Sequence, residues 1–167
     1  MFKDIYIINA YALAERLNTN TISDKQILKN VIIFIVLFTY GYTLPIEIDI
    51  QQLDEENNEY ISGLYWLVTG IINFFGIILL FKENESGDGT DFYKRFLALS
   101  LPVNILVAII IIISMILVGI LVYLFESTIN NLTDIHMNII MLSFLIIYML
   151  AFYALMKKYI KVAARKA

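Results

Sequence analysis

Four long apolar stretches constrain this chain more than any other feature of its sequence. They cover residues 24–44, 60–81, 96–125 and 137–156. A helix needs about 20 apolar residues to cross the hydrocarbon of a bilayer, because each residue advances about 1.5 Å. Hydrophobic residues make up 60% of the 167 positions and charged residues 16%, so a soluble fold would expose large apolar patches. The sequence predicts an all-α integral membrane protein with four transmembrane helices in two antiparallel hairpins.

The start of the first stretch carries a helix-capping signal. Ser23 and Gln26 have the spacing of a capping box, in which each side chain bonds to the other residue's backbone N–H. Ile22 and Ile27 stand where a hydrophobic staple would lie. Pro45 should end this helix, because the residue before a proline avoids helical geometry.

The third stretch is too long to cross the bilayer upright. Pro102 divides it in the prediction, with Asp91–Leu101 as an interfacial entry segment and Val103–Phe125 as the span. The fourth stretch has Thr133 or Asp134 as its expected N-cap.

The basic residues predict how the chain is oriented. All 12 Lys and Arg residues lie before or near the start of the first stretch, between the second and third, or after the fourth. The loops 45–59 and 126–136 contain none. Because Lys and Arg mark cytoplasmic loops, both termini and the middle loop are expected in the cytoplasm, with the protein in the cell inner membrane.

The N-terminal region does not read as a signal peptide, because charged residues interrupt any apolar segment. Residues 1–22 are expected to form a cytoplasmic interfacial segment, residues 23–160 the transmembrane domain, and residues 161–167 a basic cytoplasmic tail. A short helix is predicted within residues 1–18, resting on the inner interface or docking a partner. Its expected face comprises Phe2, Ile5, Tyr6, Asn9, Leu13 and Arg16.

The predicted membrane interior contains no ionisable group deep in a span. Such groups mark proton relays, ion pathways and voltage sensors, so their absence argues against a proton-coupled transporter, pump or voltage sensor. Two amides, Asn73 and Asn104, are expected at similar depth on neighbouring helices. They form either an interhelical hydrogen bond or a polar constriction in a pore.

The second stretch also carries a face of small and polar residues. Small residues let helix backbones approach closely in lipid, within one protomer or between protomers. The candidates for helix packing or a polar pore are Ser62, Thr69, Gly70, Asn73, Gly76 and Asn104.

The first external loop is acidic and alternates between apolar and acidic residues. This period-two pattern favours an extended strand. The loop is either a solvated connection or, in an oligomer, an acidic ring that concentrates cations. Its acidic residues are Glu47, Asp49, Asp54, Glu55, Glu56 and Glu59.

Two cytoplasmic segments complete the set of candidates. Gly87 to Gly89 is predicted as a turn before a helix that is capped near Thr90. The tail is a topology anchor or a contact for anionic lipid, and its charges are too few to indicate nucleic acid. Its basic residues are Lys157, Lys158, Lys161, Arg165 and Lys166.

No catalytic or metal-binding constellation is evident. The chain has no Cys and one His, His136, without a cluster of ligands around it. We therefore expect no enzymatic activity and no cofactor. The favoured interpretation is a self-associating membrane anchor or scaffold subunit that works with a cytoplasmic protein partner, for example in bacterial defence or immunity. The alternative is an oligomeric cation channel with an acidic external vestibule.

Overall fold

The computed structural model describes residues 9–43, 55–124 and 134–166, with side chains in 9–36, 63–120, 140 and 142–166. These ranges are mostly helical, with short turns between helices, and contain no strand. The helices are α1 (Ala10–Asn18), α2 (Asp24–Thr43), α3 (Glu55–Ser86), α4 (Phe92–Leu124) and α6 (Asp134–Ala163). The part of the predicted strand at residues 44–54 lies outside the described residues, whereas Glu55 to Glu59 are helical rather than extended.

Three of the described helices have the length and apolar character needed to cross a membrane. The segments are Gly63–Ser86, Phe92–Ile120 and Leu142–Ala163, and only 11%, 17% and 22% of their apolar windows is buried inside the molecule. Apolar side chains exposed over such lengths require an apolar solvent, which a bilayer supplies. The protein therefore has the character of a helical membrane protein. α2, whose side chains are described only to Val36, is not among these three segments.

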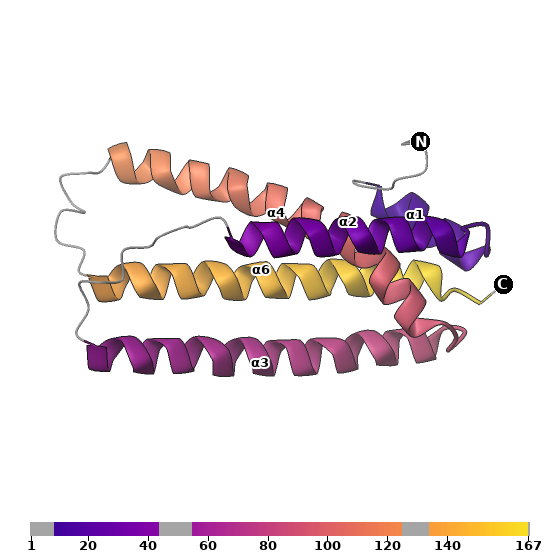
Figure 1. Ribbon diagram of the computed structural model, residues 1–167, viewed down its shortest axis with the longest axis horizontal. Coiled ribbons are helices and arrows are strands. Elements are labelled where there is room, and N and C mark those ends of the chain that lie inside the picture. The colour runs from indigo at the N-terminus through magenta and orange to yellow at the C-terminus, as the bar shows by residue number, and fades with distance from the viewer. Residues whose placement is uncertain (1–8, 44–54, 125–133, 167) are drawn as a thin grey trace.

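α6 lies between α3 and α4, as Figure 1 shows. Both α3 and α4 make their most extensive interhelical contact with α6, and α2 packs against α4. The prediction that the second and third apolar stretches are packed neighbours is therefore wrong. The turn that connects α3 and α4 is short, but the two helices diverge from it, and α6 packs between them.

The start of α2 confirms the predicted cap. The backbone N–H of Ser23 donates to Gln26 Oε1 at 3.1 Å, and the N–H of Gln26 donates to Ser23 Oγ at 3.4 Å. Ile22 and Ile27 are both buried in the hydrophobic core. This reciprocal bonding satisfies two backbone donors that a helix start otherwise leaves without partners.

The other helices are longer than predicted. α4 runs through Pro102 without a break, so the predicted entry segment and the predicted span belong to one helix, and Leu99 and Leu101 in that segment are 0% and 1% exposed. Proline removes one backbone hydrogen bond and bends a helix, and α4 changes direction near its start (Figure 1). α6 continues to Ala163, so Lys157, Lys158 and Lys161 lie on a helix and not in a tail.

α1 packs on the bundle instead of presenting its apolar face to a membrane surface. It begins at Ala10, where the Asn9 side chain accepts from the Ala12 N–H at 2.9 Å. Its buried face consists of Ala10, Leu13, Ala14 and Leu17, and it contacts α4 and α6. Of the predicted face, Leu13 is confirmed as buried, whereas Asn9 and Arg16 are not buried; Phe2, Ile5 and Tyr6 lie outside the described residues.

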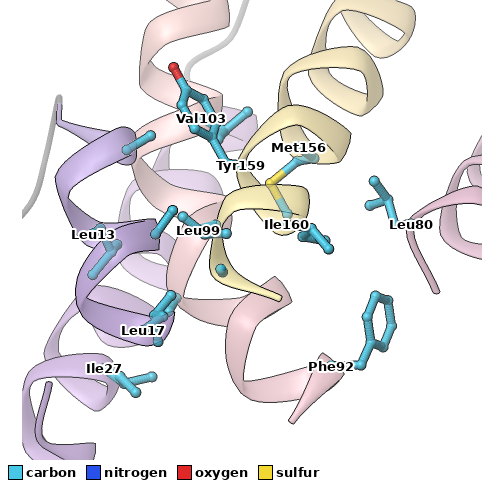
Figure 2. Close-up of a cluster of buried hydrophobic side chains, with 14 of the residues drawn as sticks. Leu13, Leu17, Ile27, Leu80, Phe92, Leu99, Val103, Met156, Tyr159 and Ile160 are labelled. Carbon is cyan, nitrogen blue, oxygen red and sulfur yellow. The ribbon is translucent and has the colours of Figure 1, made fainter. Parts of the chain in front are cut away.

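The hydrophobic core is concentrated at one end of the molecule. Figure 2 shows Leu13 and Leu17 of α1 facing Leu99 of α4 and Ile160 of α6, with Leu80 of α3 nearby. Both termini of the described chain lie at this end (Figure 1). We call it the basic end: α1, the start of α2, the turn between α3 and α4, and the last turns of α6.

Asn30 of α2 is a buried amide that sequence reasoning overlooked. It is 1% exposed, and neither polar atom of its side chain has a hydrogen-bond partner in the described part of the chain. An unsatisfied buried polar group costs about 1–3 kcal/mol.

Asn30→Leu is expected to raise the free energy of unfolding by about 1 kcal/mol, because it removes this cost while filling a similar volume. Reversible unfolding in mixed detergent micelles would measure the change, and a loss of stability would contradict the prediction.

Candidate functional site

A cavity of about 620 Å³ lies between α2, α3, α4 and α6. Its wall is mainly apolar and aromatic, with amide and hydroxyl groups among the rings. The side chains that define its chemistry are Phe34, Trp66, Thr69, Asn73, Phe96, Ser100, Asn104, Tyr148, Phe152 and Tyr153. No Asp, Glu, Lys, Arg or His is among its described lining residues. The cavity is therefore an uncharged, aromatic space with a few fixed polar groups.

Asn73 and Tyr153 form one polar pair in this wall. The Tyr153 hydroxyl donates to Asn73 Oδ1 at 2.7 Å, which joins α6 to α3. Gly76 makes this geometry possible, since a Cβ on Gly76 would lie 2.5 Å from carbons of the Tyr153 ring. The absence of a side chain at Gly76 therefore lets the ring lie against α3 and reach Asn73.

Asn104 and Tyr148 form a second pair. The Tyr148 hydroxyl donates to Asn104 Oδ1 at 2.6 Å, and the Asn104 amide donates to the Ser100 backbone carbonyl at 2.8 Å. Each amide thus makes an interhelical bond, but the expected pairing of Asn73 with Asn104 is wrong. Because α6 lies between α3 and α4, each amide bonds to a tyrosine of α6.

The small-residue face of α3 divides into two parts. Gly76 packs against α6, whereas a Cβ added at Gly63 or Gly70 would meet nothing within 4 Å. The Thr69 hydroxyl donates to the Tyr65 carbonyl of its own helix at 2.8 Å and lines the cavity. The side chain of Ser62 lies outside the described residues.

The turn between α3 and α4 is held by a buried arginine. Arg95 is 4% exposed, and its guanidinium donates to both carboxylate oxygens of Asp88 at 2.5 Å. It also donates to Asn84 Oδ1 and to the Thr90 carbonyl, each at 2.8 Å. Arg95 therefore ties the end of α3, the turn and the start of α4 together.

The same turn is fastened to the end of α6. The Asp88 backbone N–H donates to the Ala164 carbonyl at 2.9 Å. A Cβ on Gly87 would overlap that carbonyl oxygen, so the contact requires glycine. Gly89 has a φ of +70° and Asp91 a φ of 50°, which close the turn just before α4 begins at Phe92. The turn predicted from Gly87 to Gly89 is thus present, but it is a packed element.

Asp88 gives this turn a dependence on pH. The hydrogen bond from Arg95 is the main cause that lowers the pKa of Asp88 from 3.8 to about 2. A carboxylate with a lowered folded-state pKa adds stability above its unfolded pKa, and this stability disappears as pH falls through the folded pKa. We expect about 1–2 kcal/mol, reduced for solvent screening, to be lost between about pH 4 and pH 2. Unfolding at successive pH values would measure it, and Asp88→Asn should lack this part of the decline.

The remaining predicted residues divide between the two ends of the molecule. Glu55, Glu56 and Glu59 lie on the first turns of α3, and Glu47, Asp49 and Asp54 lie outside the described residues. At the basic end, Lys157 pairs with Glu83 of α3 at 3.6 Å. Lys158, Lys161, Arg165 and Lys166 are exposed. No group of three or more possible metal ligands occurs in the described residues.

Comparisons with known proteins give no relative. No protein-family model, no curated protein and no solved structure matches this chain. The geometry of the described residues is therefore the basis for a functional proposal.

Proposed function

We propose that this protein is a non-catalytic, multi-spanning subunit of the inner membrane that anchors a cytoplasmic partner at its basic end. In this proposal α2 is the fourth span, and both termini face the cytoplasm, following the positive-inside rule. The observation that supports it most strongly is the construction of the basic end, where α1, α2, α3, α4 and α6 pack together, while the described apolar side chains of α3 and α4 farther from this end are largely exposed.

The ties at the basic end join segments that are far apart in the sequence. Lys94 of α4 pairs with Asp24 of α2 at 2.9 Å, and Lys157 of α6 pairs with Glu83 of α3 at 3.6 Å. The core beneath them includes α1, which a simple bundle of membrane spans would not need. A surface that is preorganised in this way loses little conformational entropy on binding.

The exposed charge of the basic end favours an acidic partner. Lys25 and Lys29 are exposed near the start of α2, and Lys161, Arg165 and Lys166 are exposed at or just after the end of α6. Complementary charge speeds association and selects among partners. The basic end is thus suited to hold an acidic cytoplasmic protein beside the membrane.

We propose that the subunit also self-associates through α3. Gly63 and Gly70 are one heptad apart on an exposed face, and the space where their Cβ atoms would lie is open. A second copy could approach closely there, as helices do at small residues in lipid. Mass measurement in lipid nanodiscs, with Gly63→Leu and Gly70→Leu as disrupting changes, would test this association.

The partner proposal is tested by capture from native membranes followed by mass analysis. A double variant, Lys161→Glu with Lys166→Glu, should reduce the captured partner at least tenfold. The matched control, Lys161→Arg with Lys166→Arg, keeps the charge and should capture as much as the natural chain. A strict monomer that captures no protein would contradict the proposal.

The orientation can be tested with introduced thiols, because the chain contains no Cys. Lys166→Cys should react with a membrane-impermeant maleimide only after the inner membrane is permeabilised. Asn131→Cys, in a loop predicted to be external, should react in intact spheroplasts. The opposite pattern would overturn the proposed topology.

The cation channel receives less support from the described residues. Asn73 and Asn104, the amides expected to line its path, bond to tyrosines within one bundle. We therefore prefer the anchor.

A further inference from the structure

We propose that the cavity between α2, α3, α4 and α6 binds an uncharged, lipid-soluble alcohol or phenol that enters from the bilayer. Its volume of about 620 Å³ lies within the range of small-molecule sites, which is about 300–1,000 Å³. Such sites combine apolar and aromatic walls with a few placed polar groups. This inference concerns the membrane interior and does not depend on the partner proposed for the basic end.

The lining selects against charged ligands. No described lining residue carries a formal charge. An ion in hydrocarbon without a counter-charge is costly, so the occupant must be neutral. Phe34, Phe96 and Phe152 contribute aromatic faces, which favour ring-containing molecules through offset and edge contacts.

The polar pair on α3 and α6 indicates a hydroxyl group on the ligand. The Tyr153 hydroxyl donates its proton to Asn73 Oδ1, and the hydroxyl oxygen can still accept a hydrogen bond. The amide nitrogen of Asn73 has no partner within the described residues, and the residue is exposed. A donor and an acceptor therefore lie side by side. A hydroxyl matches both, because it can accept from the amide and donate to the phenol oxygen.

The cavity is accessible from the lipid-facing surface. Trp66 and Leu97 both line it, and they are 78% and 43% exposed. An acyl chain could enter by the same route but would leave the amide nitrogen of Asn73 without a partner. Unpaired polar groups in a site discriminate against analogues that lack the matching group, so a hydroxylated molecule is favoured over a simple hydrocarbon.

Trp66 provides a direct measurement, because it is the single tryptophan of the chain and lines the cavity. The probes are 4-bromo-4′-hydroxybiphenyl and 4-bromobiphenyl, which differ by one hydroxyl and quench tryptophan through bromine. The protein is placed in nanodiscs, and probe concentrations are corrected for partitioning into empty nanodiscs. Saturable quenching is expected, with half-quenching by the phenol at a concentration at least tenfold lower than by the hydrocarbon.

Two variants and one control make the result specific. Tyr153→Phe and Asn73→Leu should each remove most of the tenfold preference, and Tyr153→Phe covers the case in which Asn73→Leu does not fold. Ser114→Ala should preserve it, since Ser114 lies outside the cavity wall and donates to the Ile110 carbonyl of its own helix. Equal half-quenching by the two probes, linear quenching, or saturable quenching only by a lipid with a brominated acyl chain would overturn the proposal.

Discussion

Arg95→Gln is expected to lower the free energy of unfolding by about 3–5 kcal/mol. The guanidinium of Arg95 is 4% exposed and satisfies Asp88, Asn84 and the Thr90 carbonyl together. The shorter amide cannot reach all of them. Its loss also leaves a partly buried carboxylate without a counter-charge, which is more costly than the loss of one ordinary hydrogen bond.

The neighbouring residue supplies the control for this measurement. Lys94 pairs with Asp24, but the Asp24 side chain is 88% exposed. Exposed ion pairs contribute about 0–1 kcal/mol, so Lys94→Met should change stability by less than about 1 kcal/mol. Both variants would be unfolded in micelles with increasing sodium dodecyl sulfate. Similar effects for the two would show that Arg95 does not hold the turn.

Gly76→Ala is expected to destabilise the protein by about 2 kcal/mol, because overpacked contacts typically cost about 1–3 kcal/mol. The new Cβ would lie 2.5 Å from the Tyr153 ring, so α6 or the ring must move away from α3. That movement would also break the hydrogen bond between Tyr153 and Asn73. The same variant should therefore lose the preference of the cavity for the hydroxylated biphenyl.

Gly70→Ala is the matched control on the same helix. Nothing lies within 4 Å of its added Cβ, and alanine is favoured over glycine in a helix by about 1 kcal/mol. Gly70→Ala should therefore be neutral or slightly stabilising in dilute protein. If Gly76→Ala were equally harmless, the close approach of α3 and α6 at Tyr153 would not be important for stability.

Local signals in the sequence predicted local structure well. The Ser23–Gln26 box, with Ile22 and Ile27 beside it, depends on residues a few positions apart, and the structure confirms it. Helical character also follows from local apolar composition, and three helices able to span a membrane are present. The ends of α3 and α6 were placed too early, because charged residues such as Lys82 and Lys157 end an apolar stretch without ending a helix.

The arrangement of helices was less accessible from the sequence. The positions of Asn73 and Asn104 along two adjacent stretches suggested that they would meet, but helix order in space depends on packing over the whole bundle. Tyr148 and Tyr153 are the partners, and aromatic residues in an apolar stretch give no sign of which helix they face. Arg95 was counted as a charge that sets orientation, because nothing local distinguishes a buried arginine from an exposed one.

The uneven distribution of buried side chains has a mechanical consequence. In the described residues, burial on α4 ends at Val107, and on α6 it begins at Met149 and continues to Ala164. The half of the bundle near the termini should consequently open as one cooperative unit, and the opposite half should exchange amide protons through smaller, separate fluctuations. The half of the bundle that lies away from the termini can therefore adjust its tilt to membranes of different thickness. The packed half that contains both ends of the described chain would keep its geometry.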